Sequence, residues 1–483
     1  MILKKISIDE IMSTSNVRFG TSGARGLADN MTDEVCYAYT LAFLQEVVFK
    51  IDNTKKVILG HDLRPSSPRI ARACATAIAQ SGGEVVYAGA LPTPALALYA
   101  LQNNAAAIVV TGSHIPFDRN GLKFYRVGGE ISKADELAIQ KAVIQVPYNF
   151  ISQNLPNVNL NVEKYYVNRY VDFFGSGKFK GMHIAVYEHS SVARDLLIKI
   201  LEALGAKVIS LGRTNSFVPI DTEAVRQEDV VQASKWATEY KFDAIFSTDG
   251  DADRPLIGDE LGHWLRGDIV GILCAKFLIA DVVVTPISSN SLIEKLGWFE
   301  SVVRTRIGSP YVIAGMEEEG LHTNRVVVGF EANGGFLLGS DVMQKGRHID
   351  ALTTRDAILP MLAILSMAQD QQCKLSNLVA SLPGRYTHSD RLENFQSNKT
   401  EILINILNQN HIEAAKVMSP TSGNIVSFDM KDGFRVVFTN GDIVHLRSSG
   451  NAPELRCYSE SDSQGRAKSL CMDCLRNVVT YNN

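Results

Sequence analysis

Three short polar segments hold the residues of this chain that are equipped for chemistry, and the first surrounds Ser113. The small and β-branched residues at 105–110 predict a buried strand, which ends at the polar turn TGSH at 111–114. A serine at the end of a buried strand, with His114 beside it and Lys123 nearby, has the makings of a nucleophile with proton-transfer and anion partners. An ordinary polar turn capped by serine explains the same residues, so the remaining segments have to decide between the two.

The second segment is acidic. Asp249, Asp251 and Asp253 alternate along the chain directly after the apolar run 242–246. Crowded carboxylates repel one another unless a cation neutralises them, and ligands that offer only oxygen favour magnesium or calcium over zinc. A solvated acidic turn is the alternative, but the position after a buried strand favours metal binding.

Two different functions are compatible with parts of this acidic segment. The aspartate spacing also matches the start of an EF-hand, with Glu260 as the last ligand, but Arg254 and Pro255 stand where that loop needs its glycine turn and next ligand. In phosphatases of the haloacid-dehalogenase type, Asp249 would be the nucleophile and Asp251 the general acid. That function leaves the serine segment without a role.

The third segment, EANGG at 331–335, follows another predicted buried strand at 325–330. Two further turns combine glycine, hydroxyl groups and arginine, which suits a phosphate cradle: FGTSGARG at 19–26 and RSSGNAPELR at 447–456. Ordinary glycine-rich or solvated turns are the alternatives for both.

The order of predicted elements is strand–helix alternation, which indicates mainly parallel sheets. Sites in such sheets lie beyond the carboxyl ends of strands, so three similar α/β domains that meet at one central cleft bring the three segments together. A long helix is predicted at 350–367, and strands at 425–429, 434–439 and 443–446 place a smaller α+β domain at the end. The predicted boundaries are 1–155, 156–257, 258–372 and 373–483.

Composition excludes several classes of protein. A formal net charge of −4 offers no basic field for nucleic acid or an anionic membrane. Seven cysteines in 483 residues are not a disulfide framework, and Cys471 and Cys474 fit the core face of a helix. The apolar stretch 269–284 includes Lys276 and Asp281 and predicts a helix followed by a strand rather than a membrane span. The N-terminus lacks a signal-peptide pattern, so the expected location is the cytoplasm.

The combination of motifs resembles the α-D-phosphohexomutase family (phosphomannomutase/phosphoglucomutase) over essentially the whole chain. TGSHIP is similar to the family's phosphoserine loop, DGDADR to its metal loop, GFEANGG to its sugar-recognition loop and RSSGNAPELR to its phosphate loop. FGTSGARG resembles the N-terminal arginine segment, and VRTRIGSPYV, which contains Ser309, a further loop of the third domain.

The resemblance implies three related α/β domains with mixed, mainly parallel sheets and a C-terminal domain of TATA-box-binding-protein-like topology. It implies a phosphoserine at Ser113, a hexose 1,6-bisphosphate intermediate that also serves as activator, and Mg²⁺. The implied metal ligands are Asp249, Asp251, Asp253 and Ser113. The implied catalytic residues are Ser113, His114, Lys123 and Arg25. The implied substrate-binding residues are Glu331, Asn333, Arg254, Ser309, Arg447, Ser448, Ser449, Gly450, Asn451 and Arg456.

The hexose is predicted to be mannose, with glucose as a further substrate, and the expected assembly is a monomer or homodimer without nucleic-acid or membrane partners. Asn333 and Gly335 stand where the phosphomannomutase/phosphoglucomutase branch usually has serine and histidine. The asparagine favours a phosphoglucosamine or N-acetylglucosamine-phosphate mutase as the alternative. An aspartyl phosphatase and a non-catalytic sugar-phosphate-binding protein are two further candidate functions.

Overall fold

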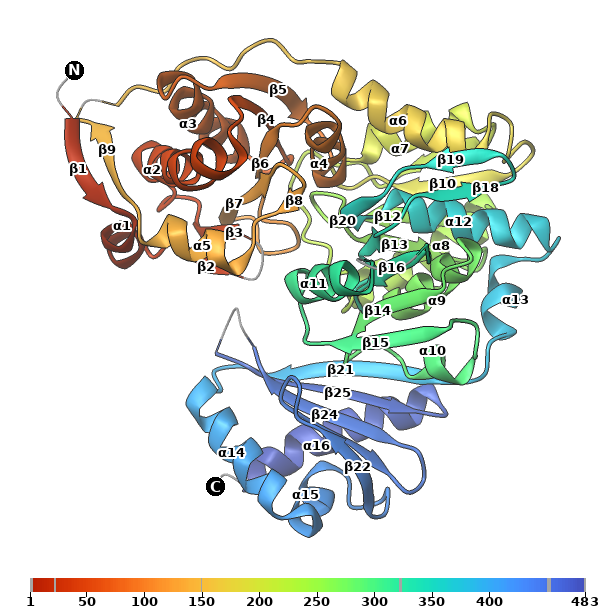
Figure 1. Ribbon diagram of the computed structural model, residues 1–483. Helices are drawn as coiled ribbons and strands as arrows, with labels where there is room; N and C mark the ends of the chain where they lie inside the picture. The colour runs from red at the N-terminus through yellow and green to blue at the C-terminus, as the bar shows by residue number, and fades with distance from the viewer. Residues whose placement is uncertain (1–2, 21–22, 149, 321–323, 450–452, 482–483) are drawn as a thin grey trace.

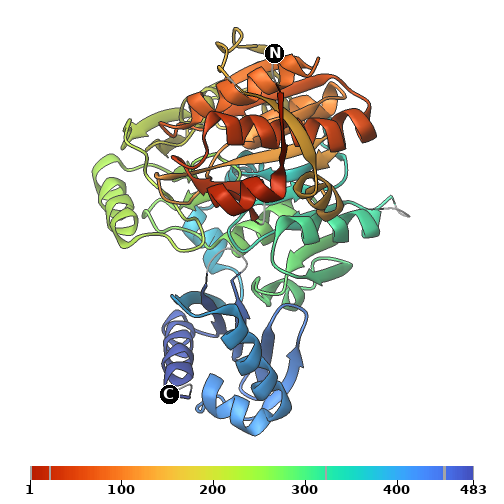
Figure 2. The same ribbon diagram turned by 90° about the vertical axis from the view of Figure 1, so that its left-hand side faces the viewer.

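The computed structural model describes residues 3–20, 23–148, 150–320, 324–449 and 453–481. Three α/β domains lie together, and a fourth domain, blue in Figure 1, extends from the third. The view in Figure 2, turned by 90°, shows the same separation between the fourth domain and the rest.

The first domain is built on a seven-stranded sheet of order β2-β3-β7-β6-β4-β5, with β8 paired to β7. Its strands are β2 (Arg18–Gly20), β3 (Gly23–Leu27), β4 (Lys56–His61), β5 (Glu84–Ala90), β6 (Ala106–Val110), β7 (Arg119–Arg126) and β8 (Gly129–Glu130). Its helices are α2 (Asp33–Phe43), the π-helix η1 (Leu44–Asp52), α3 (Ser67–Gln80), α4 (Thr93–Gln102) and α5 (Lys133–Gln140). A separate two-stranded sheet joins β1 (Leu3–Ser7) to β9 (Val143–Pro147), and α1 (Ile8–Ser15) follows β1.

The second domain has a four-stranded sheet of order β11-β10-β12-β13, and the third a five-stranded sheet of order β15-β14-β16-β17-β20. The second comprises α6 (Asn161–Phe174), β10 (His183–Tyr187), α7 (Arg194–Ala203), β11 (Lys207–Leu211), α8 (Gln227–Tyr240), β12 (Ala244–Thr248) and β13 (Pro255–Gly258). The third comprises α9 (Gly267–Phe277), β14 (Val282–Pro286), α10 (Leu292–Lys295), β15 (Ser301–Thr305), α11 (Ser309–Gly320), β16 (Val327–Phe330), β17 (Phe336–Leu338), the hairpin β18 (Val342–Gln344) and β19 (Arg347–Ile349), β20 (Leu352–Asp356), α12 (Ile358–Asp370) and α13 (Leu375–Ala380).

The three α/β sheets repeat one topology. In each, a central strand pairs in parallel with the strands before and after it in the order, and the third strand then turns back into an antiparallel partner. The reversing turns are β6–β7, β12–β13 and β16–β17. These turns contain Ser113, the aspartate triplet and Glu331 respectively, so the repeat delivers each polar segment from the equivalent place in its domain.

The fourth domain has a wholly antiparallel five-stranded sheet of order β21-β25-β24-β23-β22. It comprises β21 (Tyr386–Leu392), α14 (Ser397–Gln409), α15 (His411–Met418), β22 (Ile425–Asp429), β23 (Phe434–Phe438), β24 (Ile443–Ser448), β25 (Leu455–Ser461) and α16 (Gln464–Tyr481). Its helices and strands enclose a hydrophobic core of their own, in which Cys471 and Cys474 are buried as expected.

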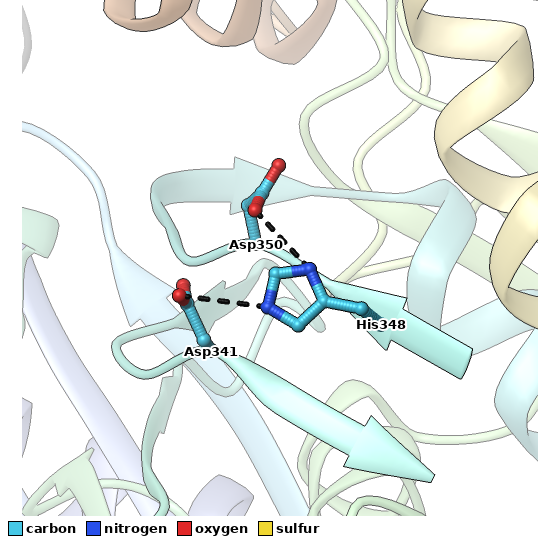
Figure 3. Close-up of side chains that lie close together, drawn as sticks. All are labelled: Asp341, His348 and Asp350. Atoms are coloured by element: carbon cyan, nitrogen blue, oxygen red, sulfur yellow. Dashed lines mark ion pairs between the residues drawn. The ribbon is translucent and has the colours of Figure 1, made fainter. Parts of the chain in front are cut away.

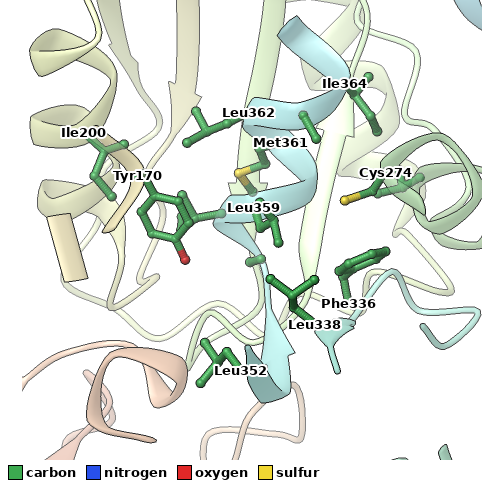
Figure 4. Close-up of a cluster of buried hydrophobic side chains, with 14 of the residues drawn as sticks. Tyr170, Ile200, Cys274, Phe336, Leu338, Leu352, Leu359, Met361, Leu362 and Ile364 are labelled. Atoms are coloured by element: carbon green, nitrogen blue, oxygen red, sulfur yellow. The ribbon is translucent and has the colours of Figure 1, made fainter. Parts of the chain in front are cut away.

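By contrast, one continuous hydrophobic core runs through the first three domains. Figure 4 shows α12 at its centre, with Leu359 and Met361 between Tyr170 and Ile200 of the second domain and Phe336 of the third. The shared core fixes these domains relative to one another, because any rearrangement would expose large apolar side chains to water.

The predicted helix at 350–367 is wrong in its first half. Residues 352–356 form strand β20, and the helix α12 begins only at Ile358. The β-branched pair Thr353 and Thr354 suits a strand, and β20 completes the sheet edge by pairing with β17. At the start of α2 the Thr32 side chain is the N-cap and accepts a hydrogen bond from Val35 N. In the described parts of the chain, none of the helices is both long and apolar enough to cross a membrane.

Candidate active site

The hydroxyl of Ser113 lies directly against the aspartate triplet. Its Oγ donates a hydrogen bond of 2.6 Å to Asp249 Oδ2, although the two residues are 136 positions apart. Ser113 is 1 % exposed and has a φ of 55°, in the left-handed region that L-residues other than asparagine and aspartate seldom adopt. Such a backbone costs about 1–3 kcal/mol and persists only where the surroundings hold it in place.

What holds the serine turn in place is Arg64, which sequence reasoning missed. Its guanidinium donates to four backbone carbonyls of the turn and to one carboxylate. The acceptors are Ser113 O (2.8 Å), Ile115 O (2.6 Å), Pro116 O (2.5 Å), Arg119 O (2.9 Å) and Asp62 Oδ2 (3.2 Å). The Phe217 ring of the second domain covers the guanidinium, with its centroid 4.0 Å from Cζ. All five N–H donors of Arg64 are therefore used, and the turn is fixed from behind.

The aspartate triplet has the properties of a metal site. Carboxylate oxygens of Asp249, Asp251 and Asp253 lie within 4.8 Å of one another, and all three residues are buried. Asp251 Oδ1 and Asp253 Oδ1 are buried without a hydrogen-bond partner among the described atoms. Burial, followed by the charges of Asp251 and Asp253, raises the pKa of Asp249 well above its usual value. Three clustered carboxylates with unpartnered oxygens fit a divalent cation.

Lys123 and Arg25 line the same cluster, from neighbouring strands. Lys123 Nζ lies 2.6 Å from Asp251 Oδ2 and 2.7 Å from Asp253 Oδ2. Burial alone would lower the pKa of Lys123, but these two carboxylates outweigh it and raise the pKa, so the lysine is charged. Burial and then the charge of Arg254 lower the pKa of Arg25 to about 10, and Arg25 Nε has no hydrogen-bond partner within the described residues.

His114 is bonded more closely to Arg254, beside the metal loop, than to Ser113. Arg254 Nη1 donates to His114 Nδ1 at 2.9 Å, whereas Ser113 Oγ is 3.4 Å from the same nitrogen. Burial, followed by the charge of Arg254, lowers the pKa of His114 well below its usual value, with Asp221 opposing the shift. The imidazole is therefore neutral, and its Nδ1 is an acceptor.

The sugar-recognition segment is joined to this cluster by Arg355, a second residue that sequence reasoning missed. Arg355 donates to Asp253 Oδ2 from Nε (3.0 Å) and Nη2 (2.8 Å), and from Nη1 to Glu331 Oε2 (3.1 Å) and Ser309 Oγ (3.0 Å). Asn333 closes its own turn, since its Oδ1 accepts from Gly335 N at 2.9 Å. Arg355 thus links Glu331 and Ser309 of the third domain to Asp253 of the aspartate triplet.

Arg456, at the end of the phosphate turn, lines a cavity between the fourth domain and the second. The cavity has about 70 Å³ and is lined by Arg456, Tyr458 and Arg391 together with Asp221 and Glu223.

Two donors in the described part of the phosphate turn are unsatisfied. Ser448 Oγ and Arg456 Nε are buried without a hydrogen-bond partner among the described residues, while Arg447 Nη1 is 3.5 Å from Asp432 Oδ2. Ser449 N donates to Glu454 O at 2.9 Å, and the predicted Gly450 and Asn451 lie outside the described residues. Arg456, which lines the cavity and has an unsatisfied Nε, is suited to bind an anion.

A second group of possible metal ligands lies on the hairpin β18–β19, away from these segments (Figure 3). His348 Nε2 is 3.6 Å from Asp341 and Nδ1 is 3.4 Å from Asp350. The two ring nitrogens face different carboxylates and the group is largely exposed, so the geometry is that of a surface ion-pair cluster.

Comparison with known proteins agrees with the fold. Models for phosphoglucomutase/phosphomannomutase match residues 16–148 (α/β/α domain I), 164–262 (domain II), 266–386 (domain III) and 403–476 (C-terminal domain). The chain is 47 % identical to a phosphomannomutase from Salmonella muenchen, over 97 % of each chain. It is 43 % identical to a phosphomannomutase from Sinorhizobium fredii, over 94 % of this chain and 97 % of the other.

Solved structures share the fold at lower identity. A putative phosphomannomutase from Thermus thermophilus aligns with a TM-score of 0.74 at 21 % identity, over 96 % of this chain and 99 % of the other. An N-acetylphosphoglucosamine mutase from Aspergillus fumigatus aligns with a TM-score of 0.58 at 15 % identity, over 98 % of this chain and 99 % of the other. Fold and site together define an isomerase of the phosphohexomutase type. The chain belongs to the phosphoglucomutase/phosphomannomutase family.

Proposed function

We propose that this chain interconverts hexose 6-phosphate and hexose 1-phosphate through a phosphoserine at Ser113, and that mannose phosphates are its preferred substrates. The observation that carries the proposal is the hydrogen bond of 2.6 Å from Ser113 Oγ to Asp249 Oδ2. It supports a nucleophilic hydroxyl held at a cluster able to bind a cation. A hydroxyl in a strained turn clamped by Arg64 approaches its acceptor with little reorganisation.

Each half-reaction exchanges one P–O bond for another. In the first, the bond from phosphorus to Ser113 Oγ breaks, a bond from phosphorus to a hexose hydroxyl oxygen forms, and the proton of that hydroxyl ends on Ser113 Oγ. In the second, the bisphosphate has turned around: the bond from its other phosphorus to the hexose oxygen breaks, a bond to Ser113 Oγ forms, and the serine proton ends on the hexose oxygen. Asp249, Asp251, Asp253 and the oxygen at Ser113 would hold Mg²⁺, which would supply positive charge beside the transferring phosphoryl group.

The remaining site residues bind and orient the substrate. Lys123 is charged, which suits it to stabilise phosphoryl oxygens, and Arg25 has an unpartnered Nε for the same purpose. Glu331 binds sugar hydroxyls, and the turn at Arg447 and Arg456 holds the phosphate that is not transferred. Hexose 1,6-bisphosphate acts as activator by rephosphorylating a chain whose serine has lost its phosphate.

Sequence identity to known mutases favours mannose over the amino sugars as the substrate. The two phosphomannomutases are 47 % and 43 % identical over nearly the whole chain, whereas a phosphoglucosamine mutase from Pelobacter propionicus is 28 % identical over 76 % of it. The phosphoglucosamine activity stays the second candidate because Asn333 occupies the sugar-recognition turn.

A panel assay tests the proposal. The 1-phosphates of mannose, glucose, glucosamine and N-acetylglucosamine are supplied with Mg²⁺ and a bisphosphate activator, and the 6-phosphate product is measured before and after chelation. Turnover of the mannose ester ahead of the others, lost on chelation, supports the proposal. Hydrolysis without isomerisation that survives Ser113→Ala points to an aspartyl phosphatase, and saturable binding without turnover points to a sensor.

A further inference from the structure

The space next to Gly335 is occupied by the side chain of Arg355. A Cβ added at Gly335 would lie 2.6 Å from Arg355 Cδ and 2.9 Å from its Cγ, both too close for real atoms. The two residues are neighbours because β17 pairs with β20 through Phe336 and Asp356. The absence of a side chain at 335 is therefore what allows the stem of Arg355 to pass across the sugar-recognition turn.

The guanidinium at the end of that stem joins two domains. It donates twice to Asp253 Oδ2 in the metal loop of the second domain, and once each to Glu331 Oε2 and Ser309 Oγ in the third. Lys123 Nζ also binds Asp253 Oδ2, at 2.7 Å. Both cations thus engage the same oxygen of Asp253, and Oδ1 is left without a hydrogen-bond partner within the described residues.

We propose that Arg355 is a positioning residue that orients Glu331 toward the sugar and sets the separation of the sugar-recognition turn from the metal loop. The inference rests on the proposed function. The side chain of Arg355 is 3 % exposed and lies against Glu331, whose side chain is 6 % exposed, so Arg355 acts through the glutamate and does not face the substrate itself.

Arginine suits this task better than other cations. Its planar fork donates in fixed directions, so one side chain binds Asp253 with one edge and Glu331 with another. Lysine in the same place supplies charge but cannot hold both carboxylates in a defined orientation. Gly335 and Arg355 therefore form one unit: the glycine supplies the passage and the arginine supplies the orientation.

The first experiment measures equilibrium binding by calorimetry in a Ser113→Ala parent chain, in which phosphate transfer is blocked. The probes are mannose 1-phosphate and inorganic phosphate, each with and without Mg²⁺. Arg355→Met is expected to weaken mannose 1-phosphate binding on the order of 10–100-fold, the usual loss when a group that orients a ligand is removed. Arg355→Lys is expected to lose less, and binding of inorganic phosphate is expected to stay unchanged.

Arg169→Met is the matched control. Arg169 is another buried arginine, 9 % exposed, whose Nη2 donates to Asp350 O, outside the site segments. It is expected to leave both affinities unchanged. Equal losses for the two probes in Arg355→Met, or the same pattern in Arg169→Met, would mean general damage to the fold and would overturn the inference.

The second experiment is a pair of double-mutant cycles. If Arg355 acts through Glu331, Arg355→Met adds no further loss of sugar affinity to Glu331→Gln. If Gly335 only provides the passage, Gly335→Ala weakens sugar binding in the parent chain but not in Arg355→Ala. Additive losses in either cycle overturn the inference.

The two proposals fail in different ways. The chain could isomerise none of the four hexose phosphates while both double-mutant cycles give non-additive losses of sugar affinity. That result would contradict the proposed function but support the role of Arg355. An active mutase in which Arg355→Met binds mannose 1-phosphate normally would end only the inference. Failure of the parent chain to bind mannose 1-phosphate contradicts both.

Discussion

The turn that holds Ser113 and the turn that holds Arg447 differ in how completely their polar groups are engaged. Arg64 uses all five donors to hold the Ser113 turn, and Lys123 is paired with two carboxylates. In the described part of the chain, the unpartnered groups there therefore lie on the metal-loop side, at Asp251 Oδ1, Asp253 Oδ1 and Arg25 Nε. In the fourth domain, Ser448 Oγ and Arg456 Nε are buried without partners among the described residues.

The hydrophobic packing differs in the same sense. The first three domains share one core, but the fourth has its own and contacts the third through polar pairs such as Asn290 Nδ2 to Arg385 O at 2.9 Å and Ile307 N to Asp432 Oδ2 at 2.9 Å. A cavity of about 470 Å³, lined by residues such as Trp264, Leu382 and Tyr386, lies at this joint.

This contrast suits a reaction in which the bonds change at a fixed place while the substrate is held in either of two orientations. Chemistry at Ser113 requires preorganised groups, because reorganisation at the moment of transfer raises the barrier. The phosphate turn must bind the phosphate of two differently placed esters. Donors that have no partner in the protein are free to bind that phosphate in either case. If the Ser113 turn is rigid and the Arg447 turn is open, substitutions at the first should cost more free energy, of unfolding or of catalysis, than substitutions at the second.

The largest effect is expected for Ser113→Ala. Removing the hydroxyl removes the phosphoryl acceptor, so mutase activity falls to background with every hexose phosphate, while the melting temperature stays close to that of the parent. Activity is followed by a coupled assay and folding by circular dichroism. A Ser113→Ala variant that keeps measurable isomerisation contradicts the role of Ser113 as the phosphoryl carrier.

Arg64→Met should destabilise the chain by about 3–5 kcal/mol, because it leaves Asp62 buried without its cation and the turn carbonyls without donors. The control is Lys50→Met in the same domain, since Lys50 is 67 % exposed in its side chain and pairs with Glu46 at 2.9 Å; its loss should be about 1 kcal/mol or less. Urea unfolding measures both. Equal losses of unfolding free energy for the two variants would show that the Ser113 turn is held no more rigidly than the surface.

Acid should destabilise the fourth domain through His445. Burial lowers the pKa of His445 to about 4, and nearby Arg435 and Arg447 add to this while the hydrogen bond to Asp432 O opposes it. Because the unfolded chain takes up the proton first, the contribution is complete above the ordinary histidine pKa of about 6.5 and is lost as pH falls toward 4, up to about 3 kcal/mol.

His445→Gln should remove this part of the pH dependence. Unfolding of the fourth domain between pH 7 and 4 is followed through hydrogen exchange of its peptides. A wild-type profile that is flat across this interval, or one that the substitution leaves unchanged, would refute the assignment to His445.

The smallest effect is expected for Arg447→Lys. The substitution keeps the charge but loses the fork, so KM for the hexose phosphate should rise about tenfold, which corresponds to about 1.4 kcal/mol, with kcat nearly unchanged. Steady-state kinetics separates the two constants. A drop in kcat with unchanged KM would place the phosphate turn in the chemical step and remove the distinction between the two regions.

Much of the site is visible in the sequence because each segment follows a buried strand. The strand pattern predicts Ser113, Asp249 and Glu331 just beyond buried strands, and the structure adds that the chain reverses there into an antiparallel partner. Arg64 and Arg355 were missed because each acts on segments far away in the chain, and no local pattern reports such contacts. Arg355 was hidden further by the helix predicted at 350–367, where the edge of the third sheet overrides a helix-compatible sequence.

The central claim is that Ser113 carries the phosphoryl group and passes it to the sugar. The direct measurement is a chase: the chain is labelled with ³²P from hexose 1,6-bisphosphate, mixed with unlabelled mannose 1-phosphate and Mg²⁺, and quenched over time. The account predicts label on Ser113 by peptide mass spectrometry and its transfer to the bisphosphate at a rate no slower than turnover. Label found on Asp249, or label that stays on the protein while product forms, would contradict it.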